Sequence, residues 1–584
     1  MTPRCRFASF TILTLAVGAC SGGASTAQVT PSYTNAVQSA AYPEGWAIKT
    51  SRPASVAEHA MIASNSDLAS AAGVEILKKG GNAVDAAVAV GFALEVTFPF
   101  AGNIGGGGFM VIRMADGRVA SIDYREVAPL AATRDMYVEN GKLTNKSLVG
   151  ALAVGVPGAV AGMSDALAKY GSMSLHDVMQ PAIRLASGGF VVDSNLSRGL
   201  ERSHKLIAQF AGSKIFFPGG AVVAQGSTLK QPELARTLSL IADQGPRAFY
   251  DGPIADQIVA EMKRDGGIIT KEDLKRYKAE WREPITGTYR GYTLYTMPPA
   301  SSGGITMLET MNQLEALGPM PPFNSAMYKH YLAETFRRSF IDRNTKLGDP
   351  AFVKVPMAEL TSKAYAKGIA STIDPAHATK TPTFTASAAE PMHTTHYSVV
   401  DAQGNAVSTT TTLNGGFGSG TFVDGAGFFL NNEMDDFAAQ PGQPNQFGLV
   451  QGEVNAVQPG KRMLSAMSPT IVLDPSGTLL LVVGAAGGPT IITGVTQVVL
   501  NVIDHHMNLA DAMYAPRVHH QAWPDSLTYE ANGLSHAAMD SLEAMGHHLK
   551  KISGLTNVNA VMRAPGGGWV GVYEPRSSGG AIGY

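Results

Sequence analysis

The sequence predicts a compact chain in which helices and strands are mixed. Its 584 residues are 45% hydrophobic and only 16% charged, and 64 of them are glycine. These proportions describe one glycine-rich α/β body as well as they describe several separate domains. Helical periodicity near residue 70 and a strand hairpin near residue 400 indicate that both types of element are present.

The start of the chain has the pattern of an export signal. Two arginines precede an apolar run over 7–19, which is too short to be a permanent transmembrane helix. The letters VGAC that follow resemble a lipobox, so we expect a signal peptide over 1–19 and lipidation at Cys20. The small residues at 25–27 form a competing site for an ordinary signal peptidase. A stretch rich in Gly, Ser and Thr over 20–41 predicts a tether.

Charge and cysteine content narrow the class of partner. Lys and Arg number 45 against 47 Asp and Glu, so the chain has no basic surplus for nucleic acid. Both cysteines, Cys5 and Cys20, lie in the export region, so the exported body has no disulfide to form. We expect a small-molecule substrate and a periplasmic location, with a lipid anchor to the membrane.

Two helices begin the folded part. Residues 67–79 carry apolar side chains at helical spacing, and Gly80 follows as a C-terminal cap. A second helix starts after the N-cap Asn82, runs to about residue 96 and is apolar nearly all round, so we expect it to be buried. The glycines 105–108 then lead into a strand from Phe109. A dinucleotide loop would need a helix there, so this run predicts a close approach of two backbones.

A hairpin late in the chain is the plainest motif. Two β-branched and apolar runs, 396–400 and 406–413, flank the turn residues 401–405. Folding about this turn places Thr394 opposite Thr412, to within one residue. A threonine that starts a strand beside further hydroxyls suits a nucleophile. Residues 408–411 of the second run are interpreted as ordinary strand residues, because threonine has a high β-propensity.

A strand-to-helix turn near residue 488 has the form of an anion site. A strand over 479–483 runs into Gly487 and Gly488, and Pro489 follows at the first position of a helix over 490–505. Backbone N–H groups ahead of a helix bind anions, with the helix dipole behind them. A plain connecting turn would have the same spacing.

Three other strands are expected from alternating patterns. One covers 119–124 and leads directly to Arg125. Two final strands, over 557–563 and 569–574, flank a glycine turn and complete the sheet.

The clusters of carboxylates and histidines do not have metal-ligand spacing. Glu433, Asp435 and Asp436 stand close together in the segment LNNEMDDF, but the pattern of a calcium loop is missing. The paired histidines lack the spacing of zinc ligands. We therefore expect neither a metal nor a cofactor.

Several segments together resemble one family. TTHYSVVD, TLN, LNNEMDDF and SAMSPT follow one another in the order found in the γ-glutamyltranspeptidases, which are N-terminal-nucleophile hydrolases. The resemblance extends over 62–584. It implies an α+β fold, a four-layer αββα sandwich, and self-cleavage between His393 and Thr394. The products would be a large subunit, 42–393, and a small catalytic subunit, 394–584, interlocked in one unit.

The resemblance also implies roles for the residues of the site. Thr394 would be the nucleophile, because cleavage frees an α-amino base of pKa about 7.7 to 8 beside its hydroxyl. The other groups are Thr412 next to the nucleophile, Gly487 and Gly488 as the oxyanion hole, Arg125, Ser465 and Ala466 for a substrate α-carboxylate, and Asn414, Glu433 and Asp436 for its α-ammonium. Asp123 and Glu126 would hold Arg125, and Asp435 would be structural.

Two positions depart from the family pattern. The loop 441–452 matches a lid over the substrate pocket, but it carries Phe447 where well-known members have tyrosine. We expect this lid to pack and to fasten less firmly. Ala466 stands where most members have a second serine, so a hydroxyl that grips the α-carboxylate is missing.

The resemblance implies an exported γ-glutamyltransferase and hydrolase that cleaves glutathione and related compounds and transfers the glutamyl group to water, amino acids or peptides. An amide acylase of the cephalosporin acylase type is the alternative that Ala466 favours. An uncut binding lipoprotein with the same fold is a third interpretation, which the mass of the purified chain would distinguish.

Overall fold

The computed structural model describes Met1, Trp46 and residues 54–102, 104–381 and 394–584. Apart from Met1, these belong to one compact unit within Thr34–Tyr584. Apart from Met1, the expected signal peptide lies outside the described residues, as do Cys20, the whole tether and His393, and these stay predictions. Among the helices that are described, none is long and apolar enough to cross a membrane.

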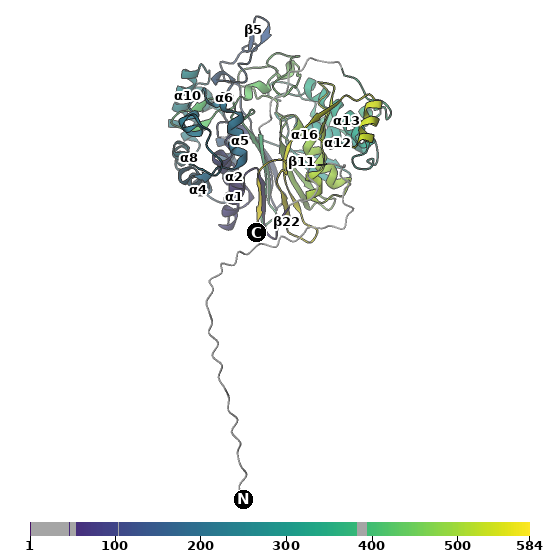
Figure 1. Cartoon of the computed structure of the whole chain (residues 1–584), viewed down its shortest axis with the longest axis horizontal. Helices are drawn as coiled ribbons and strands as arrows, with labels where there is room; N and C mark the ends of the chain where they lie inside the picture. Colours follow the sequence, from purple (N-terminus) through teal and green to yellow (C-terminus); the bar gives the residue numbers. More distant parts are fainter. Residues whose placement is uncertain (2–45, 47–53, 103, 382–393) are drawn as a thin grey trace. The chain divides into compact units, whose positions relative to one another are not determined.

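Two seven-stranded sheets form the centre of the unit (Figure 1). Sheet 1 has the order β23 (Gly580–Gly583), β2 (Met61–Ser64), β12 (Thr394–Val400), β13 (Ala406–Thr412), β3 (Gly107–Arg113), β4 (Val119–Tyr124) and β9 (Glu280–Arg282). Sheet 2 has the order β1 (Ser55–Ala57), β22 (Trp569–Val572), β21 (Asn557–Arg563), β17 (Leu479–Ala486), β16 (Thr470–Leu473), β11 (Tyr292–Thr296) and β10 (Ile285–Tyr289). The sheets face each other, with β12 and β13 against β17.

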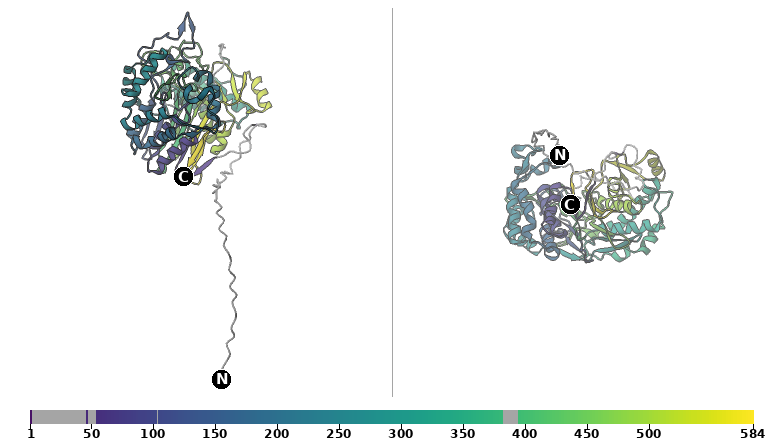
Figure 2. Two further views of the ribbon diagram at one scale, coloured as in Figure 1. Left: turned by 60° about the vertical axis from the view of Figure 1, so that its left-hand side comes forward. Right: turned by 90° about the horizontal axis from the view of Figure 1, so that it is seen from below.

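Helices cover the outer face of each sheet, as the view from below in Figure 2 shows. Sheet 1 is covered by α1 (Asp67–Lys78), α2 (Ala83–Thr97) and α3 (Ala159–Tyr170), with α4 (Leu175–Gly188) and α8 (Pro232–Gln244) outside them. Sheet 2 is covered by α12 (Gly303–Ala316), α16 (Thr490–Ile503) and α17 (Leu509–Tyr514), with α13 (Ala326–Lys346) and α15 (Lys363–Ala370) beyond. The layers are therefore α, β, β and α, which confirms the predicted sandwich.

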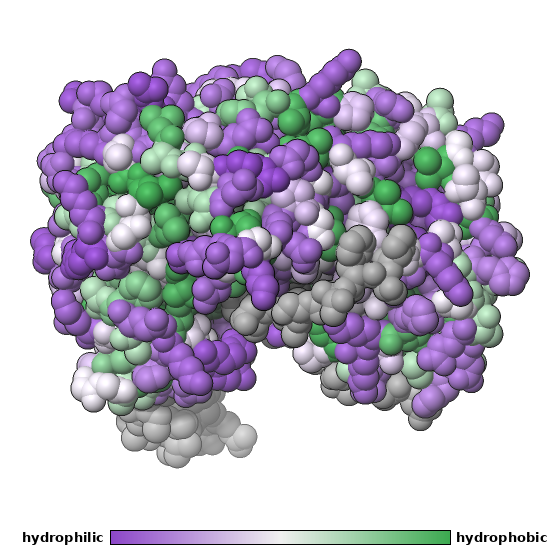
Figure 3. Space-filling view, turned by 90° about the horizontal axis from the view of Figure 1, so that it is seen from above, coloured by the Kyte–Doolittle hydropathy of each residue, from purple (hydrophilic) through white to green (hydrophobic). Residues whose placement is uncertain are grey.

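The described chain has further helices and strands besides those of the four layers. The helices are α5 (Ser194–Arg202), α6 (His204–Ile207), α7 (Ser213–Phe216), α9 (Arg247–Tyr250), α10 (Pro253–Asp265), α11 (Lys271–Arg276), α14 (Met357–Leu360) and α18 (His536–Ala544). The strands are β5 (Val138–Glu139), β6 (Lys142–Leu143), β7 (Phe190–Val191), β8 (Thr228–Leu229), β14 (Phe422–Val423), β15 (Phe428–Phe429), β18 (Val518–His519), β19 (Leu527–Glu530) and β20 (Leu549–Ile552). On the face drawn in Figure 3, hydrophilic residues predominate and hydrophobic ones form small groups between them.

The helix α2 shows how sequence determines this packing. Asn82 accepts hydrogen bonds from the N–H groups of Val84 and Asp85, and the Asp85 carboxylate accepts from the Asn82 N–H, which is a complete capping box. Every residue of the helix is buried. The prediction of a buried, all-round apolar helix is confirmed, since α2 lies between sheet 1 and α4.

The hairpin of β12 and β13 has the predicted register, with Thr394 paired to Thr412. Side chains alternate along a strand, so Thr394 shares one face with His396 and Ser398. That face meets sheet 2, where Ser398 Oγ donates to the carbonyl of Val482 at 3.1 Å. Hydroxyl-bearing residues thus link the two sheets in the interior.

Strands from both sides of the predicted cleavage site occur in both sheets. In sheet 1, β12, β13 and β23 lie after the site, and β2, β3, β4 and β9 lie before it. Cleavage would therefore leave two chains that still share both hydrogen-bonded sheets. The expectation of two final strands was incomplete, because β21 and β22 belong to sheet 2 and a third strand, β23, pairs with β2 at the edge of sheet 1.

The glycine run before β3 is in close contact with other backbone. A β-carbon added at Gly105 would lie 1.9 Å from the carbonyl oxygen of Phe429, and one at Gly106 would lie 2.0 Å from that of Thr412. The predicted close approach of two backbones is confirmed. The strand β3 begins at Gly107, slightly before the predicted Phe109.

The contact at Gly105 is testable. Gly105→Ala should lower the free energy of unfolding by about 1 to 3 kcal/mol, because the methyl group overlaps a fixed carbonyl and the chain has to shift. Gly188→Ala is the matched control, since no atom lies within 4 Å of its added β-carbon, and this helical site should be neutral or slightly stabilised. Equal denaturant midpoints for the two variants would contradict the packing role.

Candidate active site

A pocket opens at the end of the layer between the two sheets, where β12 begins and β13 ends. Its lining comes from distant parts of the chain: Arg125, Arg343, Thr394, Thr412, Asn414, Glu433, Asp436, Phe447, Leu449, Ser465, Ala466, Met467, Gly488, Pro489 and Ile491. The structure therefore brings together the residues that the sequence assigned to the site, with Gly487 adjacent to Gly488.

Thr394 lies at the base of this pocket with its hydroxyl 3.2 Å from that of Thr412. The Thr412 hydroxyl also accepts the N–H of Asn414 at 2.7 Å, and a hydroxyl that accepts one hydrogen bond can still donate its proton. His396 is close in sequence, but its ring nitrogens contact the hydroxyls of Thr410 and Ser398. Burial lowers the pKa of His396 to about 3. It is therefore uncharged and belongs to the layer between the sheets.

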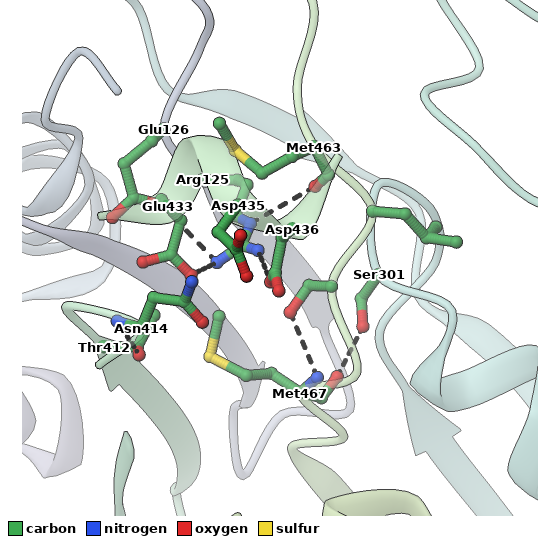
Figure 4. A network of polar contacts seen from close by, with 12 residues as sticks. Arg125, Glu126, Ser301, Thr412, Asn414, Glu433, Asp435, Asp436, Met463 and Met467 are labelled. Carbon is green, nitrogen blue, oxygen red and sulfur yellow. Dashed lines mark hydrogen bonds and ion pairs between the residues drawn. The ribbon is translucent and has the colours of Figure 1, made fainter. Parts of the chain in front are cut away.

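Arg125 is the centre of a buried charged group (Figure 4). Its Nη1 pairs with Glu433 and its Nη2 with Asp436, while Nε donates to the carbonyl of Met463 at 3.3 Å. Burial alone would lower the pKa of Arg125, but the charges of Glu433, Asp436 and Glu126 outweigh it and raise the pKa. The guanidinium thus stays charged at all relevant pH values.

The two carboxylates that pair with Arg125, those of Glu433 and Asp436, are in surroundings that disfavour their charged form. Burial raises the pKa of Glu433 and of Asp436, and the attraction of Arg125 opposes this only in part. Glu433 Oε2 is buried and has no hydrogen-bond partner among the described residues. The sequence assigned Arg125 and these carboxylates to opposite ends of a substrate, and here they pair with one another.

The neighbours of Arg125 differ in part from those expected. Glu126 lies 3.6 Å from its guanidinium, and burial raises the pKa of Glu126 to about 7. Asp123 contacts only the backbone of Arg125, whose N–H donates to Asp123 Oδ1 at 3.0 Å. The Asp123 carboxylate pairs instead with the guanidinium groups of Arg282 at 2.9 Å and Arg462 at 3.4 Å. Asp123 therefore holds Arg125 through its backbone N–H, whereas Glu126 lies beside the guanidinium.

The segment of Ser465 and Ala466 is held by the turn before α12. Ser302 donates both its N–H and its hydroxyl to the carbonyl of Ser465, at 2.8 and 2.5 Å. Ser301 Oγ donates to the carbonyl of Met467 at 2.5 Å, and the Met467 N–H donates to Ser465 Oγ at 3.1 Å, as Figure 4 shows in part. The backbone at position 466 is therefore fixed although its side chain offers no donor.

The turn of Gly487 and Gly488 connects β17 to α16. Both residues have positive φ, +141° and +55°, which glycine adopts without strain. Among the described residues neither N–H has an acceptor. Pro489 is the N-cap of α16 rather than its first residue, and the helix ends at Ile503, two residues before the predicted end.

The loop 441–452 lies over the pocket and is fastened through its main chain. The carbonyl of Phe447 accepts from Gln521 Nε2 at 3.2 Å, and the N–H groups of Phe447 and Leu449 both donate to Asn445 Oδ1 at 3.1 Å. Asp435 supports the same loop, since it accepts the Gln446 N–H at 3.0 Å. The Phe447 side chain packs inside without taking part in these bonds.

Five pocket residues were not assigned to the site from the sequence, although Leu449 belongs to the loop that was expected to cover it: Arg343, Leu449, Met467, Pro489 and Ile491. Four of them are apolar and carry no chemical signal. Arg343 sits in the last turn of α13, where a basic residue is ordinary because it complements the helix dipole. Within the described ranges, no group of three or more His, Cys, Asp or Glu could hold a metal ion.

Comparisons with known proteins agree with this geometry. The sequence model of the γ-glutamyltranspeptidase family matches residues 69–584. A glutathione hydrolase proenzyme of Escherichia coli (strain K12) is 48% identical over 529 residues, which cover 89% of this chain and 91% of the relative. One from Pseudomonas sp. (strain A14) is 45% identical and covers 90% and 95%.

A solved structure also matches along most of the chain. The crystal structure of cephalosporin acylase from Bacillus halodurans superposes with a TM-score of 0.81 at 27% identity, covering 93% of this chain and 99% of that one. The family match includes every strand of the two sheets except β1 and β2, and every residue that lines the pocket. The chain therefore belongs to the γ-glutamyltranspeptidase family, and it is an enzyme of the γ-glutamyltransferase class.

Proposed function

We propose that this enzyme cleaves the γ-glutamyl amide bond of glutathione and related compounds through an acyl-enzyme on Thr394. The observation that carries the proposal is the pocket itself, in which a strand-starting threonine faces a buried arginine and two buried carboxylates. A free glutamyl group has one carboxylate and one ammonium at its α-carbon. Both find a partner of opposite charge in this pocket.

Maturation would free the catalytic base. The Thr394 hydroxyl attacks the carbonyl carbon of His393, the acyl group moves from nitrogen to oxygen, and water hydrolyses the resulting ester. His393 leaves as a carboxylate, and Thr394 gains an α-amino group of pKa about 7.7 to 8. That amine is near its working pH and is attached to the residue that carries the nucleophile.

In the catalytic cycle the α-amine takes the proton of the Thr394 hydroxyl while the oxygen attacks the γ-carbonyl carbon. The proton passes to the leaving amine, which departs as the C–N bond breaks and leaves an ester on Thr394. Water or an acceptor amine then attacks that ester and regenerates the hydroxyl. The N–H groups of Gly487 and Gly488 are suited to stabilise the oxyanion at each stage, and Thr412 orients the nucleophile through its 3.2 Å contact.

Substrate charges would replace charges within the protein. The α-carboxylate would pair with Arg125 and Ser465, and the α-ammonium with Glu433, Asp436 and Asn414. Glu433 supports this role, because its Oε2 has no partner among the described residues. Arg125 would then exchange its carboxylate partners in the protein for the substrate carboxylate, and Glu433 and Asp436 would exchange Arg125 for the substrate ammonium. No buried charge is left unpaired by this exchange.

An acylase that acts on substrates without an α-ammonium is the second candidate. Ala466 favours it, because this position offers no side-chain donor to a carboxylate. The glutathione hydrolase relatives are nevertheless 45 and 48% identical, against 39% for an acylase proenzyme of Pseudomonas sp. (strain SE83) and 27% for the acylase structure. Assays of a γ-glutamyl anilide and a glutaryl anilide, with and without a dipeptide acceptor, distinguish the two. We also propose that the enzyme is exported, that it is lipidated at Cys20, and that its mature form consists of two subunits.

The nucleophile is tested by two substitutions. Thr394→Ala has no oxygen to attack His393, so it should remain a single inactive chain by mass spectrometry. Thr394→Ser keeps the oxygen but loses the methyl group that restricts χ1, so it should mature and turn over more slowly. A Thr394→Ala protein that still matured to a chain starting at residue 394 would require the assignment to be withdrawn.

Arg125→Lys should separate maturation from substrate binding. The variant keeps a charge beside Glu433 and Asp436 but loses the bidentate fork, so we expect two subunits on a gel and donor binding weakened by about 1.5 to 3 kcal/mol. Arg118→Lys is the control, since this exposed residue pairs with Asp116, lies over the Tyr170 ring and does not line the pocket. A normal KM for γ-glutamyl donors in Arg125→Lys would argue against the carboxylate role.

Ala466→Ser should improve donor binding. The new hydroxyl lies on a backbone segment that is already fixed, and one hydrogen bond to a charged group contributes about 1.5 to 3 kcal/mol at most. We expect a lower KM for γ-glutamyl donors with little change in kcat. Ala466→Gly, which gains no hydroxyl, should not share the effect. A raised KM in Ala466→Ser would indicate a pocket built for a different group.

A further inference from the structure

Arg343 is a second buried cation of the pocket, and the mechanism above does not use it. It lies near the end of α13, is 1% exposed, and lines the pocket together with Arg125. Burial lowers the pKa of Arg343 to about 10. The guanidinium therefore still carries its charge at neutral pH.

The contacts of Arg343 are neutral and use only part of its donors. Nε donates to Ser302 Oγ at 3.2 Å, and Nη1 donates to Asn344 Oδ1 at 3.0 Å and to Gln451 Oε1 at 2.7 Å. Within the described chain, Nη2 has no acceptor and no carboxylate comes within 4.0 Å of the guanidinium. These contacts hold the Arg343 guanidinium in one orientation, and they leave the two N–H groups of Nη2 available to a ligand.

The two arginines of the pocket thus differ in their charge balance. Arg125 lies within 4.0 Å of three carboxylates, those of Glu433, Asp436 and Glu126, whereas no carboxylate of the described structure lies that close to Arg343, on which the charge of Asp436 acts only from a greater distance. A buried charge without a partner is costly. An anionic group of the ligand would supply that partner.

Arg343 also adjoins the backbone that was assigned to the α-carboxylate. Ser302 Oγ accepts from Arg343 Nε and donates to the carbonyl of Ser465, so one hydroxyl joins the guanidinium to the peptide unit before Ala466. On the opposite side, Gln451 Nε2 donates to the carbonyl of Asp436 at 3.1 Å. Arg343 therefore sits between the two halves of the substrate site.

We propose that Arg343 is a specificity-determining residue, which binds the α-carboxylate of a γ-glutamyl substrate jointly with Arg125. This inference rests on the proposed function. Two guanidinium groups share four carboxylate lone-pair directions readily, because each supplies planar N–H donors. The second arginine supplies the donors that the side chain of Ala466 lacks.

The test compares two substrates in the mature full-length enzyme: γ-glutamyl-p-nitroanilide and its α-carboxamide, which differ only in the α-carboxylate charge. Arg343→Gln should raise KM for the acid on the order of 10- to 100-fold with kcat changed far less, and should lower the acid-to-amide ratio of kcat/KM by a similar factor. Lys346→Gln is the matched control, since it removes a cation from the same turn of α13 that pairs with Asp342 and does not line the pocket, and it should leave that ratio unchanged.

Equal losses on both substrates in Arg343→Gln, or an unchanged KM for the acid, would overturn the assignment and leave a structural role. If Arg343→Gln does not mature, Arg343→Lys provides the same comparison with the charge kept and the planar fork removed, and it should show a smaller fall in the ratio. A wild-type enzyme that cleaves neither substrate would instead contradict the proposed function, so the two failures are distinguishable.

Discussion

The pairing register of β12 with β13 is the constraint on which the site depends. Thr394 faces the layer between the sheets because it is paired with Thr412 at the end of the hairpin. A shift by one residue would turn Thr394 towards the helices and remove its hydroxyl from the pocket. The register is secured by the apolar side chains that alternate with the hydroxyls, since Tyr397, Val399 and Val407 belong to the core beneath α2.

Charge balance determines what the pocket can accept. The cations Arg125 and Arg343 and the carboxylates Glu433 and Asp436 are buried side chains that line one pocket. A zwitterionic group can enter such a site without changing its net charge, because each of its ends meets the opposite sign. A purely anionic or purely cationic group of the same size would leave one buried carboxylate or guanidinium without compensation.

Local patterns predicted the parts of the structure that are determined locally. The Asn82 capping box, the buried helix α2 and the hairpin register all follow from residues close together in sequence. The position of the edge strand β23 and the ion pairs of Asp123 with Arg282 and Arg462 depend on segments that are distant in sequence. The periodicity of a single sequence carries no information about such long-range pairings. The family resemblance supplied most of the site, whereas Arg343 was missed because a basic residue at a helix end is ordinary.

The departures at Ala466 and Phe447 both remove a hydroxyl, and in both places main-chain contacts remain. At position 466 Ser302 fixes the neighbouring carbonyl. At position 447 the carbonyl accepts from Gln521, whose Oε1 is 2.9 Å from His519 Nε2, and His519 Nδ1 is 2.9 Å from Thr493 Oγ1 in α16.

That chain of contacts connects the loop over the pocket to the helix that follows Gly487 and Gly488. Burial lowers the pKa of His519 to about 4, so its ring stays neutral across the neutral pH range and the connection keeps one protonation state. The loop and the turn suited to the oxyanion are therefore joined through side chains rather than through the substrate. A hydroxyl at position 447 would add a second fastening to a loop that the main chain already holds.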